Sequence, residues 1–278
     1  MNHNTFLLNP VQGGVIKLRY TDYGDLIITP GDNPPEIVDA MLETGYSEEF
    51  CVAADFSPEF IAGLMEAGFL VMSTSVSGPY EQPCYILLPK LHLVRSVLFF
   101  ENLHIKKSIR RYLNRYELRF DEDFDLIVSR CLDIHGQGWL TPPLVEAIRF
   151  IRGGISSGWL GMAGRSPGGV YRSAKDFKNY NEMKDFYRVR PVSFALYRDG
   201  KLVAGEFGIT TGRVYTSYSG YYDECNAGTV QLIKTAEYLC NNGFAFFDLG
   251  MPLDYKSDLG AKNISPEEFV KRFRDGTR

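Results

Sequence analysis

The chain has 278 residues, of which 45% are hydrophobic and 14% are aromatic, enough to build one large core or two ordinary ones. Its formal net charge is -4 at pH 7. This balance excludes a protein that coats nucleic acid with its whole surface, so any polyanion site must be a local patch.

Cysteine, histidine and glycine patterns exclude several other classes of site. The five cysteines are scattered and odd in number, which favours a reducing compartment over a disulfide framework. The four histidines stand apart, and the sequence has no HExxH or CxxC motif, so we expect no metal. Gly136-Gln137-Gly138 is too short for a dinucleotide fingerprint, and we expect no cofactor.

The start of the chain and its apolar stretches bear on location. Residues 1–10 contain no basic start followed by an apolar run, so we expect no signal peptide. The apolar stretches are too short to span a bilayer. We therefore expect a cytoplasmic protein without membrane contact.

Two similar stretches, residues 32–46 and 55–69, open the chain. Each predicts a helix with proline in its first turn, ended by Gly45 or Gly68 in the left-handed conformation. Ser57 is expected to cap the second helix. An apolar strand follows each helix, which predicts two helix–strand pieces on one small sheet. Residues 73–83, rich in Ser, Thr, Gly and Pro, are expected to form a loop.

The middle of the chain predicts a strand and three helices. The strand covers residues 95–100 and the helices cover 103–116, 123–134 and 141–151. The residues expected to face inward from the last two helices are Phe124, Ile127, Val128, Cys131, Leu144, Ala147, Ile148 and Ile151. Residues 153–188 have weak periodicity and predict a long surface excursion.

The last third of the chain predicts a meander followed by a helix and a strand. Strands are expected at residues 192–198, 202–209 and 213–218, with a turn at Asp199-Gly200. A helix at 226–241, a strand at 244–248 and a helix capped by Ser265 complete the order. This order predicts an α/β (α+β) chain with a small N-terminal domain (1–94). A GNAT-like domain (95–278) would follow, with a mainly antiparallel sheet and an insertion at about 153–188.

The segment from residue 103 to 116, here called the basic segment, carries five cations and no acid. We expect these side chains to face solvent and to bind the phosphates of a nucleic acid. The alternative is an ordinary solvated helix face. The five cations are Lys106, Lys107, Arg110, Arg111 and Arg115.

At this segment the sequence resembles the leucyl/phenylalanyl-tRNA–protein transferases. Asp55-Phe56-Ser57-Pro58 with Gly68-Phe69 is similar to the GDLSP and GIFPW stretches of that family. Arg95 followed by residues 103–108 resembles its strand and LHISRS-type helix. Gly138-Trp139-Leu140-Thr141 with Val145-Glu146-Ala147 resembles its GTWIT…VEAY stretch.

The C-terminal half continues the resemblance in the same order. Gly205-Glu206-Phe207-Gly208 with Gly212 resembles the family's GGMYG strand and the turn after it. Asn226-Ala227 matches the start of its ENAS helix. Asp248 with residues 257–261 resembles its D-x-Q…SLGA ending. The resemblance covers roughly residues 50–275, with residues 153–188 as an insertion.

The resemblance implies a small N-terminal domain, a GNAT-like domain and a reaction. The reaction moves leucine, phenylalanine or a related residue from charged tRNA to the N-terminal α-amine of an acceptor protein. By family analogy the acceptor begins with Arg or Lys and is marked for N-end-rule degradation. The basic segment would hold the acceptor stem of the tRNA.

The resemblance also assigns roles to single residues. Asp248 is expected to be catalytic, orienting the amine or accepting its proton, and its alternative is a turn cap. Trp139 would stack on the terminal adenosine, and its alternative is a core aromatic. Asn226 and Asp254 are candidates for acceptor binding. The expected aminoacyl and adenosine pocket consists of Met72, Trp139, Phe207, Tyr215, Tyr218, Gly220, Phe247 and Gly250.

Several positions depart from the family's pattern. Gly250 replaces a glutamine and Tyr218 a glutamate. The other replacements are Met72 for tryptophan, Tyr255 for histidine, Ile148 for tyrosine and Gly220 for methionine. The change at Gly220 enlarges the expected pocket, and we hypothesise an aminoacyl preference that differs from leucine.

These departures keep two alternatives open. The first is a relative that binds tRNA or another RNA with weak or no transferase activity. The second is an acyl-CoA N-acetyltransferase of the same fold. Residues 221–225, just before a helix, contain no glycine to cradle a pyrophosphate, which argues against CoA.

Overall fold

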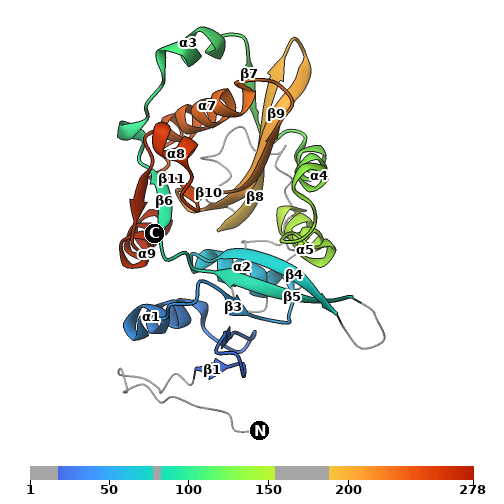
Figure 1. Cartoon of the computed structure of the whole chain (residues 1–278), viewed down its shortest axis with the longest axis vertical. Coiled ribbons are helices and arrows are strands. Elements are labelled where there is room, and N and C mark those ends of the chain that lie inside the picture. The colour runs from blue at the N-terminus through green and yellow to red at the C-terminus, as the bar shows by residue number, and fades with distance from the viewer. Residues whose placement is uncertain (1–17, 78–82, 154–187) are drawn as a thin grey trace, which may run out of the picture. The chain divides into compact units, whose positions relative to one another are not determined.

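The computed structural model describes residues 18–77, 83–153 and 188–278, which form two compact units (Figure 1). The first unit lies within Met1–Leu93 and Gln137–Ala147, and the second within Val94–Gly136 and Ile148–Arg278. Nearly all of the expected insertion at 153–188 falls outside the described residues.

The assignment of Gln137–Ala147 differs from the predicted division at residue 94. Ser73 explains the difference, because its backbone nitrogen donates to the Trp139 carbonyl at 2.9 Å. Its Oγ also accepts from the Thr141 backbone nitrogen at 3.0 Å. Both groups are buried, so these bonds attach the segment to the first unit.

The described residues of the first unit form α1 (Pro34–Thr44), α2 (Pro58–Glu66), two small sheets and the beginning of α5 (Pro142–Gly153). A three-stranded sheet holds β1 (Arg19–Tyr20), β2 (Leu26–Ile27) and β3 (Cys51–Val52). A hairpin pairs β4 (Leu70–Ser77) with β5 (Pro83–Lys90). As predicted, Gly45 and Gly68 have positive φ, at 61° and 98°.

Three predictions for this unit are wrong in part. The strands after the two helices lie in different sheets, and isolated bridges such as Ala53↔Leu87 connect these sheets. Ser57 precedes α2 but makes no side-chain cap bond, because its hydroxyl donates to Asp55 instead. Residues 73–77 extend β4 rather than forming a loop, since pairing with β5 satisfies their backbone groups.

The second unit is built on a seven-stranded sheet in the order β12-β6-β11-β10-β9-β8-β7. Every neighbouring pair is antiparallel except β10 and β11. The predicted α/β class with a mixed, mainly antiparallel sheet is therefore confirmed. The strands are β6 (Arg95–Leu98), β7 (Glu117–Phe120), β8 (Val189–Arg198), β9 (Lys201–Thr211), β10 (Val214–Tyr222), β11 (Phe246–Gly250) and β12 (Lys262–Ile264).

Helices cover both faces of this sheet (Figure 1). The helix α7 (Ala227–Asn241) connects β10 to β11 and packs on one face, whereas α4 (Phe124–His135) packs on the other. The remaining helical elements are the 3-10 turn η2 (Phe100–Asn102), α3 (Lys107–Leu113), α5 (Pro142–Gly153), α8 (Asp254–Asp258) and α9 (Pro266–Thr277).

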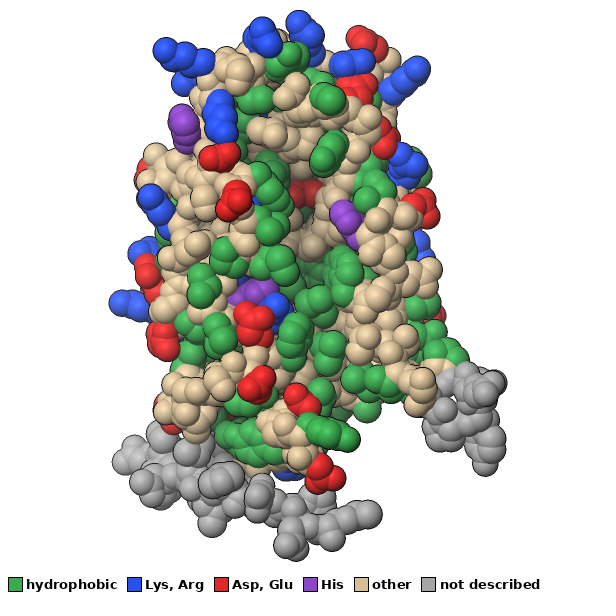
Figure 2. All heavy atoms as spheres, viewed as in Figure 1, with side chains coloured by type: hydrophobic (Ala, Val, Ile, Leu, Met, Phe, Trp, Pro, Cys, Tyr) green, Lys and Arg blue, Asp and Glu red, His purple; other side chains and the backbone are tan. Residues whose placement is uncertain are grey.

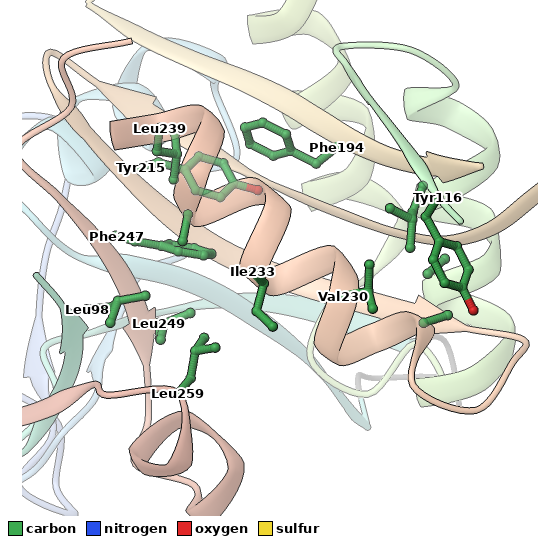
Figure 3. Packing of buried hydrophobic residues seen from close by; sticks show 14 of the residues in the cluster. Leu98, Tyr116, Phe194, Tyr215, Val230, Ile233, Leu239, Phe247, Leu249 and Leu259 are labelled. Atoms are coloured by element: carbon green, nitrogen blue, oxygen red, sulfur yellow. The ribbon is translucent and has the colours of Figure 1, made fainter. Parts of the chain in front are cut away.

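The main core lies between the sheet and α7. Figure 3 shows the Tyr215 ring beside Phe194 and Phe247, with Ile233 and Leu239 reaching down from the helix. The ring of Tyr215 lies 5.1 Å from that of Phe194 and 5.3 Å from that of Phe247. All of these side chains are fully buried, so their apolar area contributes strongly to stability.

Most predicted elements of this unit are confirmed, including the inward faces of α4 and α5 and the turn at Asp199-Gly200. Ser265 caps α9 by accepting from the Glu268 nitrogen at 3.3 Å. The helix predicted at 103–116 is shorter, spanning only 107–113. Its start is delayed because the His104 nitrogen donates to the Leu259 carbonyl at 2.8 Å. Sequence analysis missed β7, β12 and α8.

Candidate functional site

Asp248, the predicted catalytic residue, is enclosed by hydrogen-bond donors. Arg95 binds both carboxylate oxygens, with Nε at 2.8 Å from Oδ1 and Nη2 at 2.6 Å from Oδ2. The Thr216 hydroxyl donates to Oδ2 at 2.8 Å, and the Gly250 nitrogen donates to Oδ1 at 3.0 Å. Both Asp248 and Arg95 are buried, with 0% and 1% of their surface exposed.

These contacts favour the structural alternative for Asp248. A carboxylate that accepts four hydrogen bonds has no free position for a substrate amine unless a donor is displaced. Through these donors it joins β6, β10 and the end of β11. The catalytic role of Asp248 stays a prediction, and the geometry instead describes the anchor of the sheet.

A second acidic side chain, Glu206 on β9, lies under α7 with 2% of its surface exposed. Its Oε2 accepts from Ser217 Oγ at 3.0 Å. Gln231 and Thr235 of α7 adjoin it, but Gln231 Nε2 donates to Thr235 Oγ1 at 2.9 Å. The Tyr215 hydroxyl lies within hydrogen-bonding reach of the Glu206 carboxyl group, and this interaction contributes to the raised pKa of Tyr215. We call this group the acidic centre: Glu206, Tyr215, Ser217, Gln231 and Thr235.

Burial dominates the electrostatics of the acidic centre. Burial raises the pKa of Glu206 to about 7. Four neighbouring groups lower this pKa, but by less than burial raises it: the side chains of Gln231, Ser217 and Thr235 and the positive charge of Lys256. Burial also raises the pKa of Tyr215, and the charge of Glu206 raises it further. Burial lowers the pKa of Lys256 on α8 to about 8. The Lys256 ammonium donates to the carbonyls of Leu249 and Met251, at 2.5 and 2.9 Å.

The raised pKa of Glu206 predicts a dependence of stability on pH. The ordinary value is 4.5, so between pH 4.5 and about 7 the folded state holds a proton that the unfolded state has lost. The free energy of unfolding therefore falls as pH rises through this window, by on the order of 3 kcal/mol from this group alone. Urea unfolding at pH 5, 6, 7 and 8 measures the slope.

The matched control is Glu206→Gln, which keeps the shape and removes the titration. The stability difference between this variant and the wild type is expected to widen from pH 5 to pH 8, in favour of the variant. A difference that does not change with pH would show that the carboxyl is not shielded from water in solution.

The residues expected to form one pocket in the second unit lie on both faces of the sheet. Tyr215 and Phe247 face α7. Phe207 faces α4, where its ring lies 5.9 Å from Phe124 and 6.1 Å from Tyr218. The described structure therefore does not bring Phe207 and Tyr218 together with Tyr215 and Phe247, because alternate residues of a strand point to opposite faces.

Gly220 belongs to the α7 face. It pairs with Glu206 across β9 and β10, and a Cβ at this position would lie 3.2 Å from the Glu206 Cβ. Glu206 therefore stands among three residues expected in the pocket: Tyr215, Gly220 and Phe247. The signal that could have revealed it is one acidic residue inside the otherwise uncharged strand 202–209.

The other expected site residues are placed as follows. Met72 and Trp139 belong to the first unit and are partly exposed, so their contribution to a pocket stays a prediction. Gly250 holds a φ of 73° and supplies a backbone donor to Asp248. Asn226 precedes α7 with a φ of 70°, and Asp254 opens α8 in an exposed position.

All five cations of the basic segment are exposed. Figure 2 shows Lys and Arg side chains gathered over the end of the second unit where Figure 1 places α3. Arg111 and Arg115 flank the Tyr112 ring, with guanidinium carbons 4.9 and 5.0 Å from its centroid. Within the described parts of the chain, only Lys106 forms an ion pair, at 2.6 Å from Asp258. The segment therefore retains a local excess of positive charge.

The basic segment is attached to α8, the helix beside the acidic centre. Lys106 binds Asp258 of α8, and the His104 nitrogen binds the Leu259 carbonyl just after it. Gly260 allows this close approach: its φ is 102°, and a Cβ there would lie 1.9 Å from the Asn102 carbonyl oxygen. Two residues before Asp258, Lys256 is near enough for its charge to lower the pKa of Glu206.

Searches of the described residues for other site types give no candidates. No group of three or more His, Cys, Asp or Glu side chains there could hold a metal ion. None of the helices within residues 18–77, 83–153 and 188–278 is both long and apolar enough to cross a membrane.

The fold and these contacts define a two-unit α+β protein with an exposed basic segment attached to the helix beside a buried acidic centre. Sequence comparison identifies its relatives. The profile of the leucyl/phenylalanyl-tRNA protein transferase family matches residues 177–274. The chain is similar to leucyl/phenylalanyl-tRNA–protein transferases, and the resemblance seen in the sequence is confirmed.

Individual relatives are similar at low identity. A leucyl/phenylalanyl-tRNA–protein transferase of Pseudomonas entomophila is 26% identical over 181 residues, covering 63% of this chain and 65% of that protein. The match therefore spans slightly less than two thirds of that relative's own length. A protein of the same name from Maridesulfovibrio salexigens is 24% identical over 225 residues, covering 79% of this chain and 77% of that protein.

Two solved structures are similar at low overall scores. The structure of L-PGS from Bacillus licheniformis covers 99% of this chain and 90% of its own, at 13% identity and a TM-score of 0.36. The C-terminal domain of a putative lysylphosphatidylglycerol synthetase from Agrobacterium fabrum gives 13% identity and a TM-score of 0.32. It covers 99% of this chain and 76% of its own.

Proposed function

We propose that this protein transfers an aminoacyl group from charged tRNA to the N-terminal α-amine of an acceptor protein. The family profile and the names of the curated relatives support this reaction class. The finer parts of the proposal are leucine, phenylalanine or a related residue as the transferred group, and an acceptor beginning with Arg or Lys. The proposal also includes a GNAT-like catalytic domain and action in the cytoplasm. The transfer would mark the acceptor protein for N-end-rule degradation.

The observation that carries the proposal is the attachment of the basic segment to α8. Four cations without an ion pair among the described residues stand on a chain with a net charge of -4. Phosphates are the ligands that such an exposed cluster binds best. Because α8 lies next to the acidic centre, a tRNA held on the basic segment would have its aminoacyl end near buried polar groups.

The chemistry needs little more than positioning. An aminoacyl ester is already activated, and an α-amine with a pKa near 8 is partly neutral at pH 7. The amine nitrogen attacks the ester carbonyl, the C–N bond forms and the C–O bond to the tRNA ribose breaks. The amine loses a proton and the ribose oxygen gains one. Holding the two reactants in register supplies much of the acceleration.

Transfer is tested directly with labelled substrates. Purified protein is mixed with tRNA charged with radiolabelled leucine, phenylalanine or methionine, and with a peptide that begins with Arg or Lys. Label on the α-amine of the peptide supports the proposal. Absence of label with every charged tRNA, despite tRNA binding, would reject the transferase.

The basic segment provides a quantitative prediction for tRNA binding. The variant Arg110→Ala/Arg111→Ala is expected to bind tRNA more weakly and with a smaller salt dependence. The slope of log K against log salt should decrease by about 1 for each phosphate contact removed. Filter binding between 50 and 200 mM salt measures both quantities.

The matched control for this prediction is Lys271→Ala, which removes an exposed cation from α9. It is expected to leave affinity and slope unchanged. Equal effects of the control and of the double variant would place the tRNA elsewhere on the surface.

A second candidate is a tRNA-binding relative with weak or no transferase activity. The four donors that occupy Asp248 favour it, as do Gly250 and Tyr218 in place of the family's glutamine and glutamate. It predicts salt-sensitive tRNA binding without labelled product. The acyl-CoA N-acetyltransferase ranks below both, since residues 221–225 offer no glycine for a pyrophosphate.

A further inference from the structure

Helix α8 is attached to the basic segment by contacts at its C-terminal end. The Lys106 ammonium pairs with Asp258, and the His104 nitrogen donates to the Leu259 carbonyl at 2.8 Å. Gly260 lets the two parts of the chain approach closely, because a Cβ there would lie 1.9 Å from a backbone oxygen of η2. The position of the basic segment is therefore tied to the position of α8.

The same helix is attached to the end of β11 by one side chain. Lys256 Nζ donates to the carbonyls of Leu249 and Met251, at 2.5 and 2.9 Å. These two residues flank Gly250, which has a φ of 73° and whose nitrogen donates to Asp248. One ammonium group therefore holds the turn that ends β11, and a helix of five residues joins this turn to the basic segment.

Lys256 is an expensive residue at this position. Its surface is 7% exposed, and within the described residues it donates to backbone carbonyls rather than to a carboxylate. A buried ammonium without a paired anion costs free energy, whereas an apolar side chain would fill the same space without this penalty. Burial accordingly lowers the pKa of Lys256 to about 8. Stability alone does not account for a lysine here, so its contacts point to a role in function.

The end of β11 needs contacts from outside the sheet. Its pairing with β10 stops at Thr216↔Asp248, although β10 continues to Tyr222 and β11 to Gly250. On its other side, the pairing with β6 has an irregular register between Asp248 and Gly250. The sheet therefore holds the end of β11 less firmly than its start, and the two hydrogen bonds of Lys256 add to the support.

We propose that Lys256 is a positioning residue for aminoacyl transfer, because it holds the end of β11 in register with the basic segment that binds the tRNA. This inference rests on the proposed transferase function. The tRNA is held on the basic segment, and α8 sets the distance from there to the turn at Gly250. Loss of the two carbonyl bonds leaves the tRNA bound but displaces the end of β11, and a misplacement of about 1 Å can reduce a rate by about 100-fold.

The test separates the transfer step from tRNA binding. Transfer is measured as the single-turnover rate at saturating protein, with the labelled tRNA that the wild type uses best and a peptide beginning with Arg. Binding is measured by filter binding between 50 and 200 mM salt. Lys256→Met keeps the length of the side chain and removes its donors. It is expected to lower the rate by about 10- to 100-fold, with the affinity for tRNA and its salt dependence unchanged.

Two further variants complete the design. Lys262→Met makes the same change at an exposed lysine on β12 and is expected to leave both rate and affinity unchanged. Gly260→Ala disturbs the attachment of α8 to the basic segment without altering Lys256 or any of the five cations. It should also lower the rate while tRNA stays bound. The double variant Lys256→Met/Gly260→Ala should lose less than the product of the two single losses, because both act through the placement of α8.

Urea unfolding of each preparation establishes that the variant is folded under the conditions of the assay. If Lys256→Met does not fold, Gly260→Ala alone decides the question. An unchanged rate in the folded variants overturns the inference, because the contacts of α8 would then serve only stability.

Three other outcomes also overturn the inference. A decrease of about 1 in the salt slope for Lys256→Met would show that the ammonium binds a phosphate directly. An equal loss of rate in Lys262→Met would assign the effect to general loss of positive charge. Losses that multiply in the double variant would show that the two attachments act independently.

The wild type separates failure of the inference from failure of the proposed function. Product from the wild type together with unchanged rates in the variants rejects the inference alone. Absence of product from the wild type with every charged tRNA rejects the proposed function and the inference with it.

Discussion

Replacing Asp248 by alanine is expected to lower the free energy of unfolding by about 3–5 kcal/mol. The substitution leaves the Arg95 guanidinium buried, with 1% of its surface exposed and without the anion that balances it. It also removes the acceptor of the Thr216 hydroxyl and of the Gly250 nitrogen. Urea unfolding followed by circular dichroism at pH 7 measures the loss.

The double variant Arg95→Leu/Asp248→Leu is the informative control. Removal of both charges leaves no unpaired ion, so the double variant should lose less stability than the sum of the two single variants. Asp248→Ala with less than about 1 kcal/mol of destabilisation would contradict the structural role. In that case the role of Asp248 as proton acceptor would become the better interpretation.

The consequence for activity follows from the same geometry. If Asp248 is the anchor of β11, then variants that retain the fold under assay conditions keep part of their transfer activity. A loss of activity without any loss of stability would instead show contact with the reacting groups. Assay and unfolding experiments therefore have to be made on the same preparations.

Leu239→Ala is expected to lower the free energy of unfolding by about 2–5 kcal/mol. Leu239 on α7 is fully buried in the core between this helix and the sheet (Figure 3). Truncation removes apolar contacts and leaves a cavity that the rigid sheet cannot fill completely. Chemical unfolding in urea at pH 7 tests the prediction.

Leu126→Ala supplies a matched control on α4, because it makes the same change in a helix at a side chain that is 50% exposed. Its effect should stay below about 1 kcal/mol, since little apolar area is lost. Equal effects at the two positions would contradict the placement of α7 over the sheet.

The sequence alone was sufficient for features with a local cause. Gly45 and Gly68 end helices because a left-handed residue costs least at glycine, and the structure places both there. The spacing of the buried residues along α4 was also predictable, because it depends on residues close together in the sequence. The same holds for the turn at Asp199-Gly200. The resemblance to the leucyl/phenylalanyl-tRNA–protein transferases was also visible in the sequence, since similar stretches occur in the same order along the chain.

Features that depend on distant partners were missed or misjudged. The stretch 73–77 looks like a loop because Ser and Thr are common in turns, but the partner strand β5 turns it into a strand. β7 and β12 are short edge strands whose pairing with β8 and β6 no local pattern announces. The helix of the basic segment is shorter than the sequence periodicity predicts. A hydrogen bond from the His104 nitrogen to the Leu259 carbonyl keeps the residues before the helix out of helical conformation.

The candidate site shows the same division most clearly. The motif resemblance in the sequence predicted a role for Asp248. It predicted none for Glu206, which in the sequence is a single acidic residue within a strand. The tertiary structure distinguishes the two carboxyl groups. Arg95, 153 residues away in the chain, forms an ion pair with Asp248, whereas burial raises the pKa of Glu206. Residue types and local order were determined by the sequence. Only the fold decided which carboxyl group is paired with a cation and which is buried without one, since burial and pairing are properties of residues brought together from distant parts of the chain.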